Sequence, residues 1–331
     1  MSLELRGITK NFGSFTANDS IDLKVGTGEI HAILGENGAG KSTLMNIVYG
    51  LLKADSGEIL VDGKSVDISN PSDALNVGIG MVHQHFMLIP VFTVAENIML
   101  GHEKSSKFRV LDLDQARAAI RAISEDFGLQ VDPDAIVETL PVGIQQKVEI
   151  IKALIYEAKV LILDEPTAVL TPQETDELLN TMRDLKSKGT SIIFITHKLR
   201  EVRAVADQIT IIRRGKVVAA VLPETSEAEL ASMMVGRAVD LAPEKYPHEM
   251  GSAILEVKNL TVRDALGTAI VKSVNFHVNA GEVLAVAGVQ GNGQSELARA
   301  LINLEDHIEG SVLLDGKEIR GASIKDSLHA G

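Results

Sequence analysis

The chain has 331 residues, of which 45% are apolar and 23% charged, and its net charge at pH 7 is -13. A single domain typically has roughly 100 to 200 residues, so this length predicts more than one folded unit, and the composition excludes a disordered or fibrous chain. The acidic balance argues against general nucleic-acid binding, and the absence of cysteine excludes disulfides and thiolate metal sites.

Apolar runs in the sequence are all much shorter than the roughly 20 residues that a membrane-spanning helix needs. The longest lie at residues 160–163, 191–196 and 283–289. The first six residues lack the basic segment and apolar run of a secretory signal. We therefore expect a cytoplasmic protein that contacts a membrane only through a protein partner.

A glycine-rich loop at residues 35–43 is the first predicted site. It follows a mostly apolar strand at 30–34 and precedes a segment that suits a helix from Leu44 onwards. In this context, backbone N–H groups close around the phosphates of a nucleotide, Lys41 neutralises the β and γ phosphates, and the Ser42 hydroxyl can ligate Mg²⁺. A purely structural turn is the alternative. The predicted nucleotide-binding residues of the loop are Gly35, Glu36, Asn37, Gly38, Ala39, Gly40, Lys41, Ser42 and Thr43.

Three further segments predict strands of two kinds. Asp62-Gly63 lies between β-rich runs and predicts a hairpin turn, because this dipeptide accepts the positive φ of tight turns. The short apolar runs at 160–163 and 191–196 are typical of strands that are covered on both faces. Together with the phosphate loop, these segments predict an α/β nucleotide-binding core with an antiparallel edge.

Two histidines, His83 and His85, flank Gln84, the last residue of a predicted strand at 80–84. Their spacing permits a metal site, although no further ligands converge on them in the sequence. The next residues, 86–92, are mostly apolar, which fits either core packing or a docking surface.

Polar side chains end both of the later apolar runs. Asp164 and Glu165 follow residues 160–163, and His197 follows residues 191–196. Carboxylates are costly at the end of a buried strand unless a cation or a reaction needs them. We expect Asp164 to hold Mg²⁺, Glu165 to polarise the attacking water and His197 to contact the γ-phosphate. A solvated strand end, or a structural histidine, is the alternative.

The sequence also repeats itself. The glycine loop at residues 35–40 recurs at 288–293, at an offset of 253 residues, and Asp62-Gly63 recurs as Asp315-Gly316. The second copy reaches only the equivalent of Gly78, so we expect a truncated tandem. Residues 241–252 carry two prolines and no helical or strand periodicity. We therefore predict a first domain at 1–241, a linker at 242–252 and a partial second domain at 253–331.

In their order along the chain, these motifs resemble those of the ATP-binding subunits of ABC transporters. The phosphate loop is followed by Gln84, by Gly-Ile-Gln-Gln at 143–146, by Asp164-Glu165 and by His197. The resemblance covers nearly the whole chain. It implies a P-loop NTPase, with an ABC-type nucleotide-binding domain that has an antiparallel β subdomain and a helical subdomain, followed by a partial second copy.

The resemblance also implies roles for individual residues. Gln84 would ligate Mg²⁺ and sense a membrane permease, and Phe12 would stack on the adenine ring. A core aromatic near a strand end is the alternative for Phe12. Two nucleotide-binding domains would enclose ATP head to tail. Residues 86–92, just after Gln84, would then be a candidate docking surface for the permease.

The chain departs from the family pattern in three places. The usual signature Leu-Ser-Gly-Gly-Gln is replaced at residues 140–144, where Pro141 removes both the serine hydroxyl and a backbone donor. In the second copy, Gln294 stands where Lys41 stands in the first, so a positive charge is lost. In a head-to-tail pair both losses fall in one composite site. Thr171, where the family often has aspartate, would weaken the domain contact further.

Tandem domains with a degenerate second loop resemble the importers of simple sugars and nucleosides, and residues 82–90 and 140–146 look most like the nucleoside-uptake branch. The resemblance implies an ATPase, with ATP and Mg²⁺ as ligands, that energises uptake of a nucleoside or simple sugar. Its partners would be membrane permease subunits, a substrate-binding protein and a second nucleotide-binding domain. It would lie on the inner face of the cell membrane, bind MgATP and hydrolyse it poorly by itself.

Two other classes of protein share the phosphate loop. A soluble ABC-type ATPase acting on ribosomes or nucleic acid has the same core without a permease, but the acidic balance and the lack of a basic linker disfavour it. A small-molecule kinase is disfavoured by the repeat and by the ordered motifs.

Overall fold

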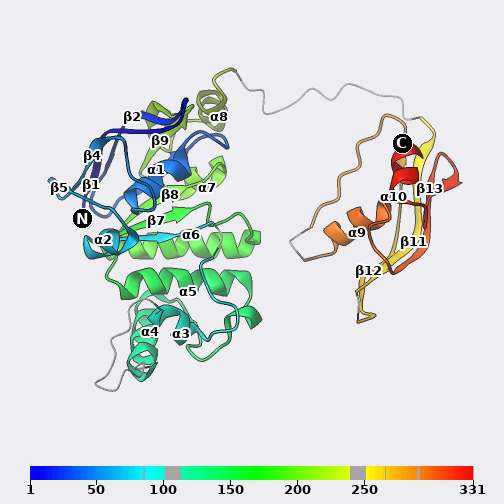
Figure 1. Cartoon of the computed structure of the whole chain (residues 1–331), viewed down its shortest axis with the longest axis horizontal. Helices are drawn as coiled ribbons and strands as arrows, with labels where there is room; N and C mark the ends of the chain where they lie inside the picture. The colour runs from blue at the N-terminus through cyan, green and yellow to red at the C-terminus, as the bar shows by residue number, and fades with distance from the viewer. Residues whose placement is uncertain (85, 101–112, 239–250, 265, 289–290, 331) are drawn as a thin grey trace. The chain divides into compact units, whose positions relative to one another are not determined.

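The computed structural model describes residues 1–84, 86–100, 113–238, 251–264, 266–288 and 291–330. The chain divides into two compact units, Met1–Leu241 and Ala242–Gly331. Figure 1 shows both units, and each is described by itself. Most of the predicted linker, residues 242–250, and His85 lie outside the described residues.

The first unit contains two sheets. One is antiparallel, with the order β2-β1-β4-β5, and the other has six strands in the order β10-β9-β3-β8-β7-β6, all parallel except β10. The strands of the antiparallel sheet are β1 (Leu3–Phe12), β2 (Phe15–Val25), β4 (Ser56–Val61) and β5 (Lys64–Val66). Those of the second sheet are β3 (Ile30–Leu34), β6 (Ile79–Val82), β7 (Val160–Asp164), β8 (Ser191–Ile195), β9 (Gln208–Arg213) and β10 (Lys216–Val221).

Helices surround the six-stranded sheet, and several of them gather at one end of the unit. In Figure 1, α5 lies next to α6, and α3 and α4 lie beyond α5, on the side away from the antiparallel sheet. This arrangement confirms the expected α/β cassette with its antiparallel and helical parts. The helices are α1 (Lys41–Val48), α2 (Pro71–Asn76), α3 (Val94–Met99), α4 (Leu113–Phe127), the 3₁₀ turn η1 (Val137–Thr139), α5 (Val142–Ile155), α6 (Pro172–Ser187), α7 (Leu199–Val205) and α8 (Glu227–Val235).

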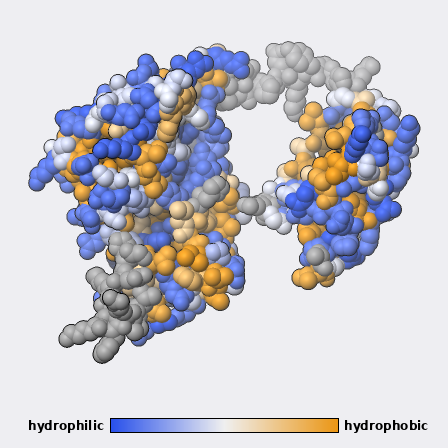
Figure 2. All heavy atoms as spheres, in the orientation of Figure 1, coloured by the Kyte–Doolittle hydropathy of each residue, from blue (hydrophilic) through white to orange (hydrophobic). Residues whose placement is uncertain are grey.

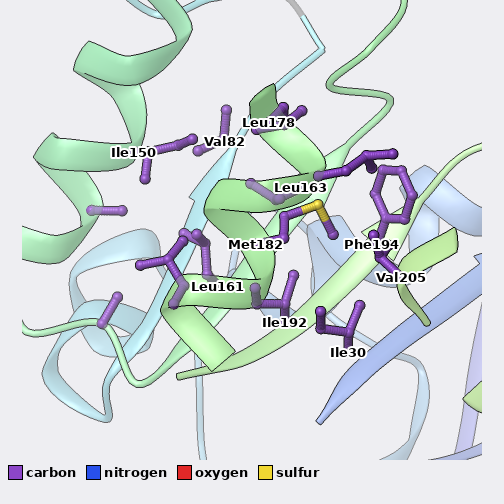
Figure 3. Packing of buried hydrophobic residues seen from close by; sticks show 14 of the residues in the cluster. Ile30, Val82, Ile150, Leu161, Leu163, Leu178, Met182, Ile192, Phe194 and Val205 are labelled. Atoms are coloured by element: carbon purple, nitrogen blue, oxygen red, sulfur yellow. The ribbon is translucent and has the colours of Figure 1, made fainter. Parts of the chain in front are cut away.

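The two faces of the six-stranded sheet pack into two hydrophobic clusters. Every residue of β7 and β8 is buried, which confirms the prediction of strands covered on both faces. Because side chains alternate along a strand, Leu161 and Leu163 face Met182 of α6 and Ile150 of α5, as Figure 3 shows. The intervening residues, such as Ile162, pack in the other cluster together with residues of α1 and of the antiparallel sheet. Because β3, β7 and β8 run parallel to one another, their carboxyl ends lie at the same edge of the sheet.

Local sequence explains where several elements begin and turn. Thr93, Thr171 and Ser226 each form a capping box with a glutamate three residues later, which fixes the start of α3, α6 and α8. The turn at Asp62-Gly63 joins β4 to β5 with φ values of 48° and 76°, as predicted. Thr171 thus performs a capping function that aspartate would also perform.

The second unit repeats the antiparallel part of the first. Its sheet has the order β12-β11-β13-β14, the counterpart of β2-β1-β4-β5, and Asp315-Gly316 forms the equivalent turn with φ values of 46° and 73°. The helices α9 and α10 begin 253 residues after α1 and α2. The elements are β11 (Ala253–Arg263), β12 (Ala269–Asn279), α9 (Gln294–Leu301), β13 (Ile308–Leu314), β14 (Lys317–Glu318) and α10 (Ile324–Ala330).

One stretch of the second unit departs from the repeat. Residues 282–288 include the positions that correspond to β3 (283–287) but form no strand, and Figure 1 draws them as coil. Val283 and Val286 are 94% and 57% exposed, whereas every residue of β3 is buried. The strand β3 is formed by hydrogen bonding to β8 and β9. The described residues of the second unit supply no such neighbours, and Figure 2 shows apolar side chains gathered on its visible face.

In the described parts of the chain, no helix combines the length and the apolar character that crossing a membrane would require.

Candidate nucleotide-binding site

The glycine-rich loop connects β3 to α1, as predicted. Gly40 is the N-cap of α1 and has a φ of 101°, and a Cβ atom there would lie 2.3 Å from the carbonyl oxygen of Ala17. Only glycine fits this position. No side chain caps the helix, so backbone N–H groups of its first turn are available to an anion.

Lys41 is the first residue of α1, and its side chain reaches back to the start of the loop. It is 5% exposed, and its Nζ donates hydrogen bonds to the carbonyl oxygens of Gly35 and Glu36 at 2.8 and 2.9 Å. Burial lowers the pKa of Lys41, while the charges of Glu165 and Asp164 raise it. The structure therefore brings a buried ammonium group, the loop and two carboxylates together.

Asp164 is the last residue of β7 and is 6% exposed. Its Oδ1 is buried and has no hydrogen-bond partner among the described residues. Burial raises the pKa of Asp164, whereas the Ser42 hydroxyl and the charge of Lys41 lower it. An unpaired carboxylate oxygen beside a hydroxyl is the donor set of a hard cation such as Mg²⁺, which completes its shell with water and phosphate oxygens. The residues present therefore fit the predicted metal.

Glu165 and His197 come from the ends of the adjacent strands β7 and β8. Glu165 has a φ of 46°, a left-handed conformation that is unusual for a residue with a side chain, and its N–H donates to Ile195 O at 2.9 Å. The His197 Nδ1 lies 3.3 Å from the Glu165 Oε1. The two predicted catalytic side chains are thus neighbours, with His197 about half exposed.

Phe12 and Gln84 both lie on the surface. Phe12 ends β1 and is 48% exposed, with Lys10 Nζ 5.7 Å from its ring centroid. This exposure removes the alternative that Phe12 is a core aromatic. Gln84 is exposed and follows β6, the strand that pairs with β7. It therefore lies at the same sheet edge as Asp164.

The possible metal site at His83 and His85 gains no support. The His83 ring packs edge-on against Tyr49, with centroids 5.7 Å apart, and burial lowers its pKa. His85 lies outside the described residues. Within the described ranges, no group of three or more His, Asp or Glu side chains could hold a metal ion.

The altered signature segment begins α5. Pro141 is the N-cap and provides no side-chain cap hydrogen bond. Gly143 packs closely on α6, because a Cβ atom there would lie 2.6 Å from Glu174 Oε1. In the second unit, Gln294 begins α9 at the position of Lys41, and its Nε2 lies against Gly288. A neutral amide therefore occupies the place of the ammonium group. Residues 289 and 290 of that loop lie outside the described residues.

The segment at 86–92 divides between the two predicted roles. Met87 and Val91 are 65% and 66% exposed, whereas Leu88 packs against the core. Met87 borders a cavity of about 330 Å³ that is also lined by Tyr49, His83 and Glu149. The Met87 N–H donates to Glu149 Oε1 at 2.7 Å.

Two residues that hold the site were not predicted. Asn18 is fully buried and donates from Nδ2 to Gly40 O at 3.0 Å, and Gln146 on α5 donates from Nε2 to Pro166 O at 2.8 Å. A comparison of the two copies gives a signal for Asn18. The second copy, whose loop has lost the lysine, has Val271 at the position of Asn18.

The raised pKa of Asp164 has a consequence for stability. The folded chain binds this proton more tightly than the unfolded chain, in which the pKa is near the ordinary value of 3.8. The free energy of unfolding therefore falls as the pH rises through this window. We expect Asp164→Asn to have a higher Tm than the wild type at pH 7, and this difference to shrink as the pH falls towards 4. Thermal unfolding without Mg²⁺ measures it, with the exposed Asp176→Asn as control; a pH-independent difference would contradict the expectation.

Comparisons with known proteins identify the family of the chain. The model of the ABC transporter family matches residues 18–168 and 271–330. The nucleoside import ATP-binding protein NupA of Lactococcus lactis is 51% identical over 96% of this chain and 63% of its own length. The guanosine import ATP-binding protein NupO of Bacillus subtilis is 46% identical over 99% of this chain and 64% of its own length. The chain thus spans less than two thirds of these relatives.

Solved structures give the same result for the fold. A nucleotide-free ATP-binding cassette from an ABC transporter is 28% identical, with a TM-score of 0.62, over 71% of this chain and 96% of that chain. Another ATP-binding cassette, in its ADP conformation, is 29% identical, with a TM-score of 0.61, over 71% of this chain and 95% of that chain.

Proposed function

The chain belongs to the ABC transporter family, and on that basis we propose that it is an ATP-binding and ATP-hydrolysing subunit that energises import of a nucleoside or simple sugar. One observation carries the proposal: Lys41, the unpaired carboxylate of Asp164 and the Glu165–His197 pair all lie around the phosphate loop. The names of the relatives, which include nucleoside, guanosine and ribose importers, support the substrate class.

The proposed mechanism uses the residues as the structure places them. Lys41 exchanges the carbonyl oxygens of the loop for phosphate oxygens, and N–H groups of α1 and its loop hold the same phosphates. Asp164 and Ser42, joined by Gln84, would hold Mg²⁺, which would offset negative charge on the transferred phosphoryl group. Glu165 orients the attacking water and accepts its proton. His197 keeps the carboxylate of Glu165 in place and contacts the γ-phosphate.

We further propose that residues 1–241 are the first nucleotide-binding domain and that residues 253–331 belong to a second, degenerate one. Gln294 begins α9 of the second unit in place of the lysine, and Pro141 precedes α5 of the first unit in place of the family serine. The site built on Lys41 would then be the hydrolysing one. The partners would be membrane permease subunits, with Met87 and Val91 at the docking surface, and a substrate-binding protein. The subunit would act on the cytoplasmic face of the membrane.

Co-purification from its native host tests this function against the alternative of a soluble ATPase that acts on ribosomes or nucleic acid. The tagged chain should bring down a membrane permease, and ATP-dependent nucleoside or sugar uptake should depend on it. Recovery of ribosomes or nucleic acid, without a permease, would overturn the proposal.

Phe12 provides a direct test of adenine binding. The exposed ring at the end of β1 should stack on the base, and base–aromatic stacking contributes about 1–3 kcal/mol. We expect Phe12→Ala to weaken ATP binding by roughly 5- to 150-fold, since about 1.4 kcal/mol is a factor of ten, and Phe12→Trp to retain it. Equilibrium binding of ATP measures both. Phe15, 61% exposed on the same hairpin, is the matched control; equal losses in Phe12→Ala and Phe15→Ala would contradict stacking.

A further inference from the structure

We propose that Glu201 is a positioning residue that fixes the loop carrying Glu165 against the loop carrying His197; this role rests on the proposed ATPase function. Glu201 lies in α7, directly after the His197 loop, and is 7% exposed. Its hydrogen bonds and its ion pair in the described part of the chain go to Thr167, Thr196 and Lys198, and not to Glu165 or His197. Its contacts instead reach the segments that support them.

One carboxylate oxygen of Glu201 accepts hydrogen bonds from both loops. Thr167 Oγ1, two residues after Glu165, donates to Glu201 Oε2 at 2.7 Å. Thr196 Oγ1, directly before His197, lies 3.5 Å from the same oxygen. Both threonines are 1% exposed, so their hydroxyl groups are shielded from bulk solvent. Glu201 therefore joins the ends of β7 and β8 through a single buried atom.

Lys198 completes the connection. Its Nζ lies 3.3 Å from Glu201 Oε1 and donates to Thr167 O at 2.8 Å, while its backbone N–H donates to Thr196 Oγ1 at 3.1 Å. From the other side, Gln146 of α5 donates to Pro166 O at 2.8 Å. The segment that follows Glu165 is thus fixed at consecutive residues by side chains from two different helices.

The buried charge favours a role in geometry over one in stability. The carboxylate of Glu201 is buried, whereas its partner Lys198 is 38% exposed, and an ion pair with one partner in contact with solvent adds little net stability. The same pair can, however, define one arrangement of the segments that it joins. Glu165 needs such definition, since its φ of 46° persists only where the surroundings fix it. Its carboxylate must also stay close to His197 Nδ1, now 3.3 Å away.

The expected effect of losing this connection is kinetic. A misplacement of about 1 Å in a catalytic group can lower a rate by roughly 100-fold. We expect Glu201→Ala to lower kcat for ATP by about 10- to 100-fold, while KM and the Kd for ATP change less than about twofold. Glu201→Gln, whose amide oxygen can still accept the threonine hydroxyls, should recover part of kcat. A residue that only stabilises the fold would not separate kcat from KM in this way.

Thr167 keeps the test decisive if Glu201→Ala fails to fold. Thr167→Val preserves shape but loses the hydroxyl, and Thr167→Ser retains it, so kcat should fall in the first and return in the second. Glu227→Gln on α8 removes an exposed pair with Arg203 of α7 and should leave kcat unchanged. All variants are compared in the full chain, with permease and partner domain supplied, by steady-state ATP hydrolysis, which gives kcat and KM, and by ATP binding and Tm.

Two results would overturn the role of Glu201, and they differ from each other. The first result is an active wild type whose kcat is unchanged in both Glu201→Ala and Thr167→Val, or whose kcat, KM and Tm all change together in these variants. It would refute positioning and leave the ATPase proposal intact. No ATP turnover in the wild type, even with permease and partner domain supplied, would refute the proposed function and with it this role.

Discussion

Lys41→Ala is expected to abolish tight ATP binding, whereas Gln294→Ala is expected to change it little. Lys41 is the buried cation of the phosphate loop, and Gln294 occupies the equivalent position as a neutral amide. A charge-assisted contact contributes about 1.5–3 kcal/mol, so losing several such bonds to phosphate should weaken binding by at least roughly 100-fold. Equilibrium binding of ATP with Mg²⁺, measured on each variant of the full chain, gives the comparison.

Two controls protect this comparison from a change in stability. Removing Lys41 also leaves the carbonyl oxygens of Gly35 and Glu36 without their donor, so the Tm of Lys41→Ala must be measured beside its affinity. Lys53→Ala removes an exposed lysine of the same unit and should not alter binding. Similar losses of affinity in Lys41→Ala and Gln294→Ala would refute the asymmetry between the two loops.

Glu165→Gln should separate hydrolysis from binding. The amide keeps the shape of the side chain beside His197 but cannot accept a proton from water. General-base catalysis typically contributes about 100- to 10,000-fold, so we expect at least a 100-fold loss of ATP hydrolysis with Kd for ATP retained. Single-turnover phosphate release at saturating ATP measures the rate.

The control for this variant is Glu177→Gln, which removes a largely exposed carboxylate of α6 that pairs with Lys147. It should hydrolyse ATP as the wild type does. A Glu165→Gln protein that kept more than about a tenth of the rate would assign the water-activating role to another group, because a true general base contributes more than this.

Local patterns in the sequence predicted the parts of the fold that depend on local physics. The continuous apolar runs at 160–163 and 191–196 became the fully buried strands β7 and β8, and Asp62-Gly63 became the predicted hairpin turn. Strand, glycine loop and helix follow one another as predicted, although α1 begins at Lys41, three residues before the predicted start at Leu44. Such signals are short in range, because they reflect turn geometry and the burial of neighbouring side chains.

The supporting contacts of the site could not be predicted in this way. Glu201 and Gln146 reach the Glu165 loop from helices that are distant in sequence, and although Gln146 belongs to the motif at 143–146, nothing in the sequence indicates which group either side chain contacts. The apolar stretch at 282–288 shows the same limit, since its composition matches that of β3 but it forms no strand. Side-chain preference makes a strand possible, and hydrogen-bonded neighbours decide whether it forms.

The stretch at 282–288 should also determine whether the chain associates with itself in solution. An apolar segment whose backbone groups pair with no strand in the described residues is a template for pairing between molecules, and exposed valines strengthen such contacts. The net charge of -13 opposes this through repulsion between chains, and salt screens that repulsion. Low ionic strength should therefore keep concentrated solutions of the chain clear, whereas raised salt should promote self-association that begins at Val283 and Val286.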